Sequence, residues 1–243
     1  MTETRARRLF IAAIMGLMLL AACNQPGDYP ATDNAPTAAD PADTSLPATS
    51  RAPASAAAAQ PTSPAVELTY FTPTQQEGPY YPPEKPADRD NDLVDLAGAT
   101  GAPAGEVLSL SGVVYDANGR PVDGALVEIW QTDSNGIYLH PGDPDTADRD
   151  PNFQFYGESL TGSDGVYSFR TILPGRYEPR PRHIHVKIKL GGQELLTTQF
   201  YFPGDVSFSG DEANLVVNLA PAEDDAGRPI WVGERDIVLR LER

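Results

Sequence analysis

The feature that most restricts the fold of this 243-residue chain is a series of short stretches in which apolar and polar side chains alternate. Alternation with a period of two residues is typical of a β-strand that buries one face. Clusters of Gly, Pro, Asn and Asp, which favour turns, separate these stretches. Strands at this spacing, with no convincing amphipathic helix between them, predict an all-β fold in which two sheets pack as a β-sandwich. The predicted strands are 107–115, 125–130, 166–171, 183–190, 195–201 and 237–241.

Composition divides the chain into three parts. Residues 1–22 combine a basic start with an apolar run that is short for a permanent bilayer span, and this pattern predicts a signal peptide. Residues 23–65 are rich in Ala, Pro, Thr, Ser and Asp. Such a segment cannot bury enough apolar surface to offset its ordering entropy, so we expect a disordered, extended tether. Residues 66–243 have the length of one domain with one sizeable core.

Cys23 ends the apolar run and is the only cysteine, which excludes an intrachain disulfide. Residues 20–23 (Leu-Ala-Ala-Cys) resemble a bacterial lipobox, in which the cysteine becomes lipidated. The pair Arg7-Arg8 resembles a twin-arginine export signal, and the alternative is an ordinary Sec signal with two adjacent arginines. We therefore expect an exported lipoprotein that contacts membrane lipid through Cys23 and faces the periplasm or the cell surface.

Charge excludes one class of partner. Acidic residues outnumber basic residues by 34 to 18, and the formal net charge at pH 7 is −16. Nucleic-acid binding needs a cationic surface, so we expect no nucleic-acid partner. The loop 141–151 contains four aspartates, and carboxylate oxygens suit calcium. These aspartates lack the register of a calcium-binding hand, so we interpret the loop as solvated.

His183 and His185 are two of only three histidines and lie one residue apart in the predicted strand 183–190. Successive side chains of a strand point to opposite faces, so the two imidazoles share one face while Ile184 and Val186 share the other. Two imidazoles about 6–7 Å apart along a strand can converge on one metal ion. The alternative is a pair of exposed histidines on an edge strand.

Two tyrosines that follow turns are candidates for further ligands, Tyr138 after 133–137 and Tyr177 after 174–176. A phenol has a pKa of about 10 and binds as phenolate only to a strongly Lewis-acidic ion. Hard anionic oxygen ligands favour a trivalent ion, so two phenolates with two imidazoles suit Fe(III) better than Zn(II) or Cu(I). The alternative for each tyrosine is an aromatic in the core or a turn whose hydroxyl makes a hydrogen bond.

Several separated motifs, in one order along the chain, resemble those of the intradiol ring-cleavage dioxygenases, most closely the iron-binding beta subunits of protocatechuate 3,4-dioxygenases. The glycine turn before Tyr138 and the Arg-Pro-x-His-x-His run at 180–185 are the firmest correspondences. The family fold is a transthyretin-like β-sandwich, which agrees with the strand pattern. The motifs lie at 77–81, 112–131, 136–140, 150–153, 164–172, 180–185 and 198–202.

The resemblance implies a non-haem Fe(III) centre that cleaves a catechol-type aromatic diol with O2 between its two hydroxylated carbons and gives a muconate-type diacid. Arg180 and Gln199 would line the substrate side, and Arg180 would stabilise negative charge that develops on the ring. Tyr177 would accept a proton from the catechol. A homo-oligomer is compatible with the resemblance. The implied metal ligands are Tyr138, Tyr177, His183 and His185.

Two features depart from this pattern or compete with it. The segment between Tyr177 and His183 is shorter than in better-known relatives, so Tyr177 is the ligand position that the resemblance defines least. Residues 112–130 also resemble transthyretin-like β-sandwich repeats that only bind or space other domains. A non-catalytic module on a lipoprotein is therefore the alternative function, and the four-ligand set discriminates against it.

Overall fold

The computed structural model describes residues 65–205 and 207–242. The predicted signal peptide, the lipidation site at Cys23 and the tether up to residue 64 lie outside these residues. Within them, no helix is both long and apolar enough to span a membrane.

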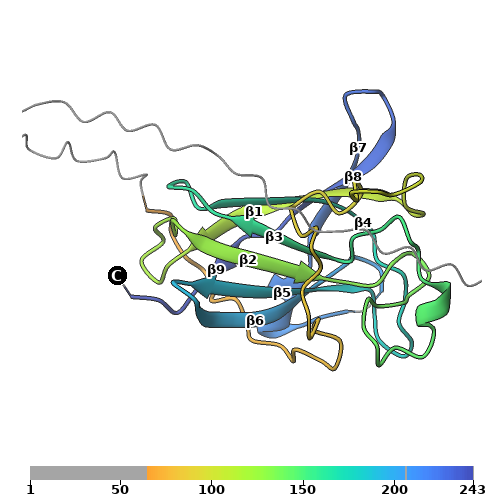
Figure 1. Ribbon diagram of the computed structural model, residues 1–243. Helices are drawn as coiled ribbons and strands as arrows, with labels where there is room; N and C mark the ends of the chain where they lie inside the picture. The colour runs from red at the N-terminus through yellow and green to blue at the C-terminus, as the bar shows by residue number, and fades with distance from the viewer. Residues whose placement is uncertain (1–64, 206, 243) are drawn as a thin grey trace, which may run out of the picture. The chain divides into compact units, whose positions relative to one another are not determined.

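In the described part of the chain, nine strands form two facing sheets, which confirms the predicted all-β sandwich (Figure 1). One sheet has the order β4-β1-β8-β7, with β9 paired to β1, and the other has the order β3-β2-β5-β6. The first sheet contains β1 (Val107–Tyr115), β4 (Val166–Ile172), β7 (Asn218–Glu223), β8 (Pro229–Glu234) and β9 (Ile237–Val238). The second contains β2 (Ala125–Trp130), β3 (Tyr156–Leu160), β5 (His183–Leu190) and β6 (Gln193–Tyr201). The helical elements are two short 3-10 helices, η1 (Thr146–Asp148) and η2 (Gly210–Leu215).

The sequence pattern located six of these strands. β1, β2 and β5 have the predicted bounds, β4 and β6 are slightly longer than predicted, and β9 is shorter. Gly191 and Gly192 form the predicted tight turn between the paired residues Leu190 and Gln193 of β5 and β6, and both glycines have positive φ, +57° and +83°. The strands β3, β7 and β8 were not predicted.

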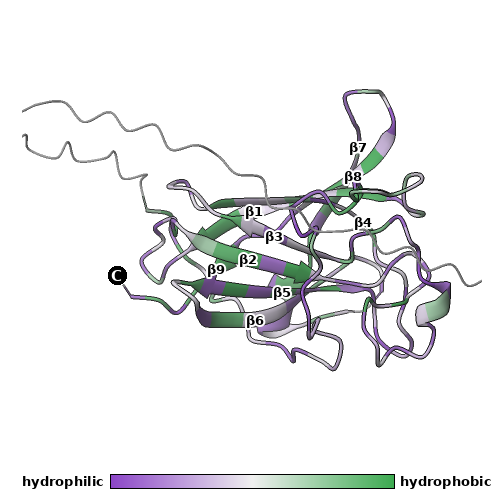
Figure 2. Ribbon diagram, in the orientation of Figure 1, coloured by the Kyte–Doolittle hydropathy of each residue, from purple (hydrophilic) through white to green (hydrophobic). Residues whose placement is uncertain are grey.

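The core lies between the two sheets because each sheet turns one alternating set of side chains inward. Leu108 and Leu110 of β1 face Ile184, Val186 and Ile188 of β5 across one continuous buried cluster, and all five are 0 % exposed. Burying a Leu, Ile or Val side chain of this kind stabilises the fold by about 1.5–3 kcal/mol. Apolar and polar colours succeed each other along β5 for the same reason (Figure 2).

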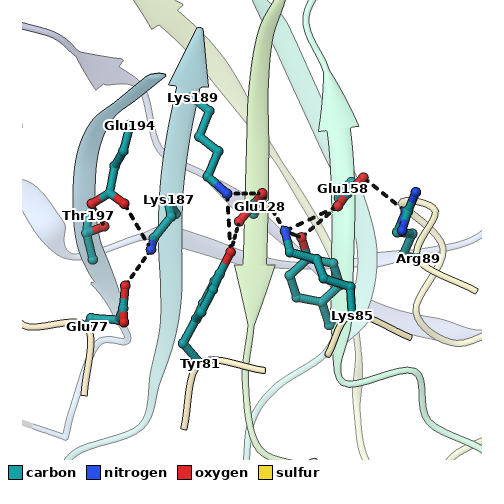
Figure 3. A network of polar contacts seen from close by, with 11 residues as sticks. Glu77, Tyr81, Lys85, Arg89, Glu128, Glu158, Lys187, Lys189, Glu194 and Thr197 are labelled. Atoms are coloured by element: carbon teal, nitrogen blue, oxygen red, sulfur yellow. Dashed lines mark hydrogen bonds and ion pairs between the residues drawn. The ribbon is translucent and has the colours of Figure 1, made fainter. Parts of the chain in front are cut away.

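The opposite face of the β3-β2-β5-β6 sheet is polar, and residues 75–92, which we term the covering segment, lie against it. Backbone hydrogen bonds fix both ends, from Gln75 N–H to the Thr197 carbonyl (2.9 Å) and from Glu158 N–H to the Arg89 carbonyl (2.9 Å). Charged and phenolic side chains fix its middle to three neighbouring strands (Figure 3). These pairs are Glu77 with Lys187, Tyr81 with Glu128, Lys85 with Glu128 and Arg89 with Glu158.

Glu128 lies at the centre of these contacts and is 1 % exposed. Burial alone would raise the pKa of its carboxyl, but hydrogen bonds from Lys189, Lys85 and Tyr81 outweigh burial and hold the pKa below its usual value. The covering segment is therefore attached to the sheet by a buried carboxylate that stays ionised at neutral pH.

Candidate metal centre

The two adjacent histidines lie on a central strand and not on an edge. β5 pairs with β2 on one side and β6 on the other, and His183 and His185 are 5 % and 4 % exposed. Both imidazoles project from the polar face of the sheet, while Ile184 and Val186 project into the core, as the alternation predicted. The alternative of exposed histidines on an edge strand is wrong.

Tyr138 completes a compact triangle of donor atoms with these histidines. Its Oη lies 3.1 Å from Nε2 of His183 and 3.2 Å from Nε2 of His185, and the two Nε2 atoms are 3.1 Å apart. Ligand atoms that share one metal ion through bonds of about 2.0–2.1 Å lie about 3 Å from each other. The triangle therefore has the dimensions of three ligands on one face of a metal ion.

The protonation of the imidazoles suits this use. Nδ1–H of His183 donates to the carbonyl of Pro181 at 2.7 Å, which leaves the lone pair on Nε2, the atom in the triangle. Burial lowers the pKa of His183 to about 4 and also lowers that of His185, and the positive charge of Arg180 acts in the same direction on both. Both rings are therefore neutral near pH 7, the form in which imidazole binds metal.

The turn before Tyr138 is built by buried carboxylates. Asp133 accepts the N–H groups of Asn135 (2.8 Å) and Ile137 (3.1 Å), and Asp143 accepts the N–H of Tyr138 itself (2.9 Å). Asp143 is 5 % exposed, and Asp150, at 8 %, accepts the N–H groups of two other loop residues. The solvated interpretation of the 141–151 loop is thus wrong for these two aspartates, because both are buried and accept hydrogen bonds from backbone amides.

Tyr177 lies next to the triangle but its hydroxyl points to another tyrosine. The Oη atoms of Tyr177 and Tyr80 are 3.0 Å apart, and the Tyr177 ring centroid is 5.8 Å from that of Tyr138. The turns that carry the two predicted ligands touch, since a Cβ on Gly136 would lie 2.1 Å from the carbonyl oxygen of Arg176. The structure therefore brings together all four predicted ligands, three of them in mutual hydrogen-bond contact.

Arg180 and Gln199, the predicted substrate-side residues, contact each other beside the histidines. Nη2 of Arg180 donates to Oε1 of Gln199 at 2.7 Å, and the hydroxyl of Tyr201 donates to the same oxygen at 2.8 Å. Nε2 of Gln199 donates to the carbonyl of Gln76 in the covering segment (2.7 Å), and Gln199 is the register partner of His185. The side-chain amide of Gln199 is thus held in place, and it holds the guanidinium of Arg180.

The charge of Arg180 also reaches the ligand set. Burial raises the pKa of the Tyr138 phenol well above its usual value, and the positive charge of Arg180 opposes this rise. A buried phenol of this kind is protonated at neutral pH unless a cation replaces its proton. Within residues 65–205 and 207–242, no group of three or more His, Cys, Asp or Glu side chains is arranged to hold a metal ion. The donor triangle at β5 combines a phenolic oxygen with two imidazole nitrogens, and this donor set fits a hard, trivalent ion.

Sequence reasoning gave no role to two aromatic residues that contact the site. Tyr80 has its ring centroid 4.8 Å from that of Tyr138 and 5.5 Å from that of His140, and its hydrogen bond to Tyr177, together with burial, raises its pKa to about 12. Trp130 stacks on His185. Their signal was membership of the 77–81 and 112–131 motifs. His140 itself is a turn residue, whose Nδ1 accepts the N–H of Gly142 at 2.9 Å.

Comparisons with known proteins give matches in sequence and in fold. A family model described as dioxygenase matches residues 76–226, more than half of the chain. The chain is 40 % identical over 154 residues to the protocatechuate 3,4-dioxygenase beta chain of Burkholderia cepacia, a match that covers 60 % of this chain and 65 % of the relative. It is 32 % identical over 159 residues to the catechol 1,2-dioxygenase of Acinetobacter baylyi, which covers 58 % of this chain and 49 % of the relative. The chain thus spans less than two thirds of the length of these curated relatives.

A solved structure shows the same fold. The dioxygenase domain of a dioxygenase and carbohydrate-binding protein fusion from Streptomyces sp. SirexAA-E superposes with a TM-score of 0.56 at 36 % identity. The match covers 71 % of this chain and 100 % of that domain.

Proposed function

The chain belongs to the intradiol ring-cleavage dioxygenases, a family of catechol and protocatechuate type that uses non-haem iron, and we propose that it cleaves a catechol-type aromatic diol with O2. The products would be muconate-type diacids, in which the bond between the two hydroxylated carbons is broken and both atoms of O2 are retained. The observation that carries this proposal is the triangle of Tyr138, His183 and His185 donors beside the Arg180–Gln199 pair.

We propose Fe(III) as the metal, with Tyr138, His183 and His185 as ligands and Tyr177 as the fourth. The first three support the proposal by their mutual distances, and Tyr177 by its position against Tyr138 on a turn that touches the Tyr138 turn. Ferric iron held by these residues would withdraw electron density from a bound catechol, and the chemistry it would supply is activation of the ring toward O2.

The protein side chains would handle protons and charge. The phenolic oxygen of Tyr177 would accept the proton of a catechol hydroxyl, and the hydroxyl of Tyr80, 3.0 Å away, would keep the protonated Tyr177 in a hydrogen bond. Arg180 would stabilise the negative charge that develops on the ring, in the direction in which its charge already acts on Tyr138. Gln199 would hold the guanidinium in place through its 2.7 Å hydrogen bond.

Oxygen uptake by iron-loaded protein over a panel of substituted catechols tests the proposal. We expect stoichiometric iron, a burgundy colour from phenolate-to-iron charge transfer, and uptake with at least one catechol. Protein that holds stoichiometric zinc, lacks tyrosinate modes in resonance Raman spectra and consumes no oxygen would instead support the non-catalytic β-sandwich module.

We also propose that the domain is displayed outside the cytoplasm as a lipoprotein. The support is the lipobox-like run at 20–23 and the Ala- and Pro-rich segment that follows it. Lipid attached at Cys23 would anchor the chain, and the tether would hold the dioxygenase domain away from the membrane surface.

A further inference from the structure

The two histidines of the donor triangle are held in different ways. Nδ1–H of His183 is fixed by the carbonyl of Pro181 at 2.7 Å. Nδ1 of His185 is buried and, among the described residues, has no hydrogen-bond partner. Metal-binding histidines usually donate their second ring N–H to an oxygen, which fixes the ring orientation and raises the basicity of the ligand nitrogen. His185 lacks this support, so another contact must set its orientation.

That contact is the indole ring of Trp130. The rings of Trp130 and His185 are parallel to within 9°, with centroids 4.6 Å apart. Gly78 of the covering segment closes over the Cε1 and Nε2 atoms of the same imidazole, since a Cβ on this glycine would lie 3.4 and 3.9 Å from them. Flat packing therefore leaves His185 little freedom to rotate out of the plane that directs Nε2 toward the other two donors.

Trp130 is in turn held by packing. It is 1 % exposed, and its Nε1 makes no hydrogen bond within the described residues. The Tyr81 ring contacts its edge in a T-shaped arrangement at 4.9 Å, and the ammonium group of Lys187 lies 6.0 Å from its ring centroid. Tyr81 donates to Glu128 at 2.7 Å, within the polar contacts that attach the covering segment to the sheet (Figure 3).

We propose that Trp130 is a positioning residue for the metal centre, which orients His185 by stacking in place of the missing hydrogen bond. The inference rests on the proposed ferric centre and goes beyond it, because it assigns a role to a residue that contacts no substrate and no donor atom other than those of the His185 ring. Because no described residue accepts a hydrogen bond from Nδ1 of His185, the proposal makes the orientation of this imidazole depend on packing.

The test compares Trp130→Leu, Trp130→Phe and Trp231→Leu in the iron-loaded protein. Trp231 lies on β8 in the other sheet, where its Nε1–H donates to Glu106, so Trp231→Leu is a matched control for the same change. The readouts are the rate at which a chelator removes iron and the electron paramagnetic resonance spectrum of the ferric ion. Neither depends on turnover.

We expect Trp130→Leu to release iron roughly ten- to a hundredfold faster than wild type, the range in which loss of a supporting residue weakens metal binding. Its ferric spectrum should also broaden as His185 takes several orientations. Trp130→Phe keeps an aromatic face and should restore most of the retention, and Trp231→Leu should release iron at the wild-type rate. If Trp130→Leu does not fold, Trp130→Met, which fills the space without a flat ring, decides in its place.

Two outcomes overturn the proposal, and they differ from each other. A folded Trp130→Leu protein with the wild-type release rate and spectrum shows that stacking does not orient His185, while the ferric centre stands. A wild-type protein that takes up no ferric ion removes the metal centre and this inference together.

Discussion

Tyr177 lies beside two other tyrosines, Tyr138 and Tyr80. It lies against Tyr138 with ring centroids 5.8 Å apart, and it shares a hydrogen bond with Tyr80. In the proposed centre, Tyr177 would serve both as a ligand and as the acceptor of a substrate proton.

Replacing Tyr177 with Phe removes the phenolic oxygen and keeps the ring. We expect the fold to survive, the charge-transfer band of the iron-loaded protein to shift, and turnover of a catechol to fall by about 10²–10⁴-fold because the proton acceptor is lost. Absorption spectra and oxygen uptake measure both effects. Tyr167→Phe, which removes a buried hydroxyl in the other sheet, should change neither. Unchanged colour and turnover in Tyr177→Phe would show that the fourth ligand is another residue.

The buried imidazoles give the metal-free protein a pH-dependent stability. Folding lowers the pKa of His183 from about 6.5 to about 4, so between these values the unfolded chain binds a proton that the folded chain does not. This contribution to the free energy of unfolding is fully present above about pH 6.5 and is lost as the pH falls toward 4. We expect a loss of about 2 kcal/mol from His183 between pH 7.5 and 5.0.

Urea denaturation of metal-free wild type and His183→Gln at these two pH values isolates the effect. The variant should lose less stability than wild type by about that amount. Equal losses in the two proteins would show that His183 is not held neutral in the fold.

Prediction from sequence succeeded for residues whose chemistry is visible in their spacing. The His183-x-His185 spacing places two imidazoles on one strand face whatever the rest of the chain does. Trp130 and Tyr80 lie in motifs of the family resemblance, but their roles became visible only through contacts with His185, Tyr138 and Tyr177, which are distant in the sequence. The burial of Asp143 was missed for the same reason, since its partner amides are set by the path of the loop.

At the scale of elements, backbone contacts and the hydroxyl of Thr132, which donates to the carbonyl of Gly175 at 3.1 Å, hold together the turns that carry Tyr138 and Tyr177. Gly136 has φ of +86°, and Gly175 N–H donates to the carbonyl of Asp133 at 2.8 Å. A glycine is required at 136 both for its left-handed backbone and because the carbonyl of Arg176 occupies the place of a Cβ. The close approach at Gly136 is thus one of the contacts that set the distance between Tyr138 and Tyr177.

Gly136→Ala should therefore weaken iron binding although Gly136 is not a proposed ligand. We expect a loss of roughly 2–4 kcal/mol in unfolding free energy, from the strained backbone and the forced separation of the turns together, with weaker iron retention. Gly124→Ala is the matched control, because Gly124 also has positive φ (+73°) but a Cβ there would meet nothing within 4 Å. It should cost only about 1–2 kcal/mol and leave iron binding unchanged. Equal effects of the two variants on iron would contradict this role of Gly136.

The strands that were not predicted, β3, β7 and β8, lack the alternation of apolar and polar residues that identified the others. β7 contains Pro221 and two alanines, and β8 begins at Pro229, so neither shows the β-rich alternating run of β1 or β5. They form a hairpin beside β1, at the edge of the first sheet, where proline is tolerated. β3 is five residues long with a glycine, too short to show a period.

At the scale of the whole molecule, the proposed lipid anchor can be tested independently of the proposed enzymatic activity. Cys23 lies at least 40 residues before the described domain, so its removal should not alter the metal centre. We expect Cys23→Ala to move the protein from the membrane to the soluble fraction, with iron content and oxygen uptake unchanged. Fractionation and gel mobility that do not change would reject lipidation.

The covering segment makes contacts with residues of β5 and β6 that lie more than 100 positions later in the chain. Glu77 pairs with Lys187, 110 positions along the chain, and the carbonyl of Gln76 accepts from Gln199, 123 positions along. Contacts that close loops of this length form slowly, after local hairpins such as β5–β6. Until then Gly78 does not cover the imidazole of His185. Affinity alone discriminates poorly among metal ions, so we expect the ions present where folding ends to decide which metal the proposed centre binds.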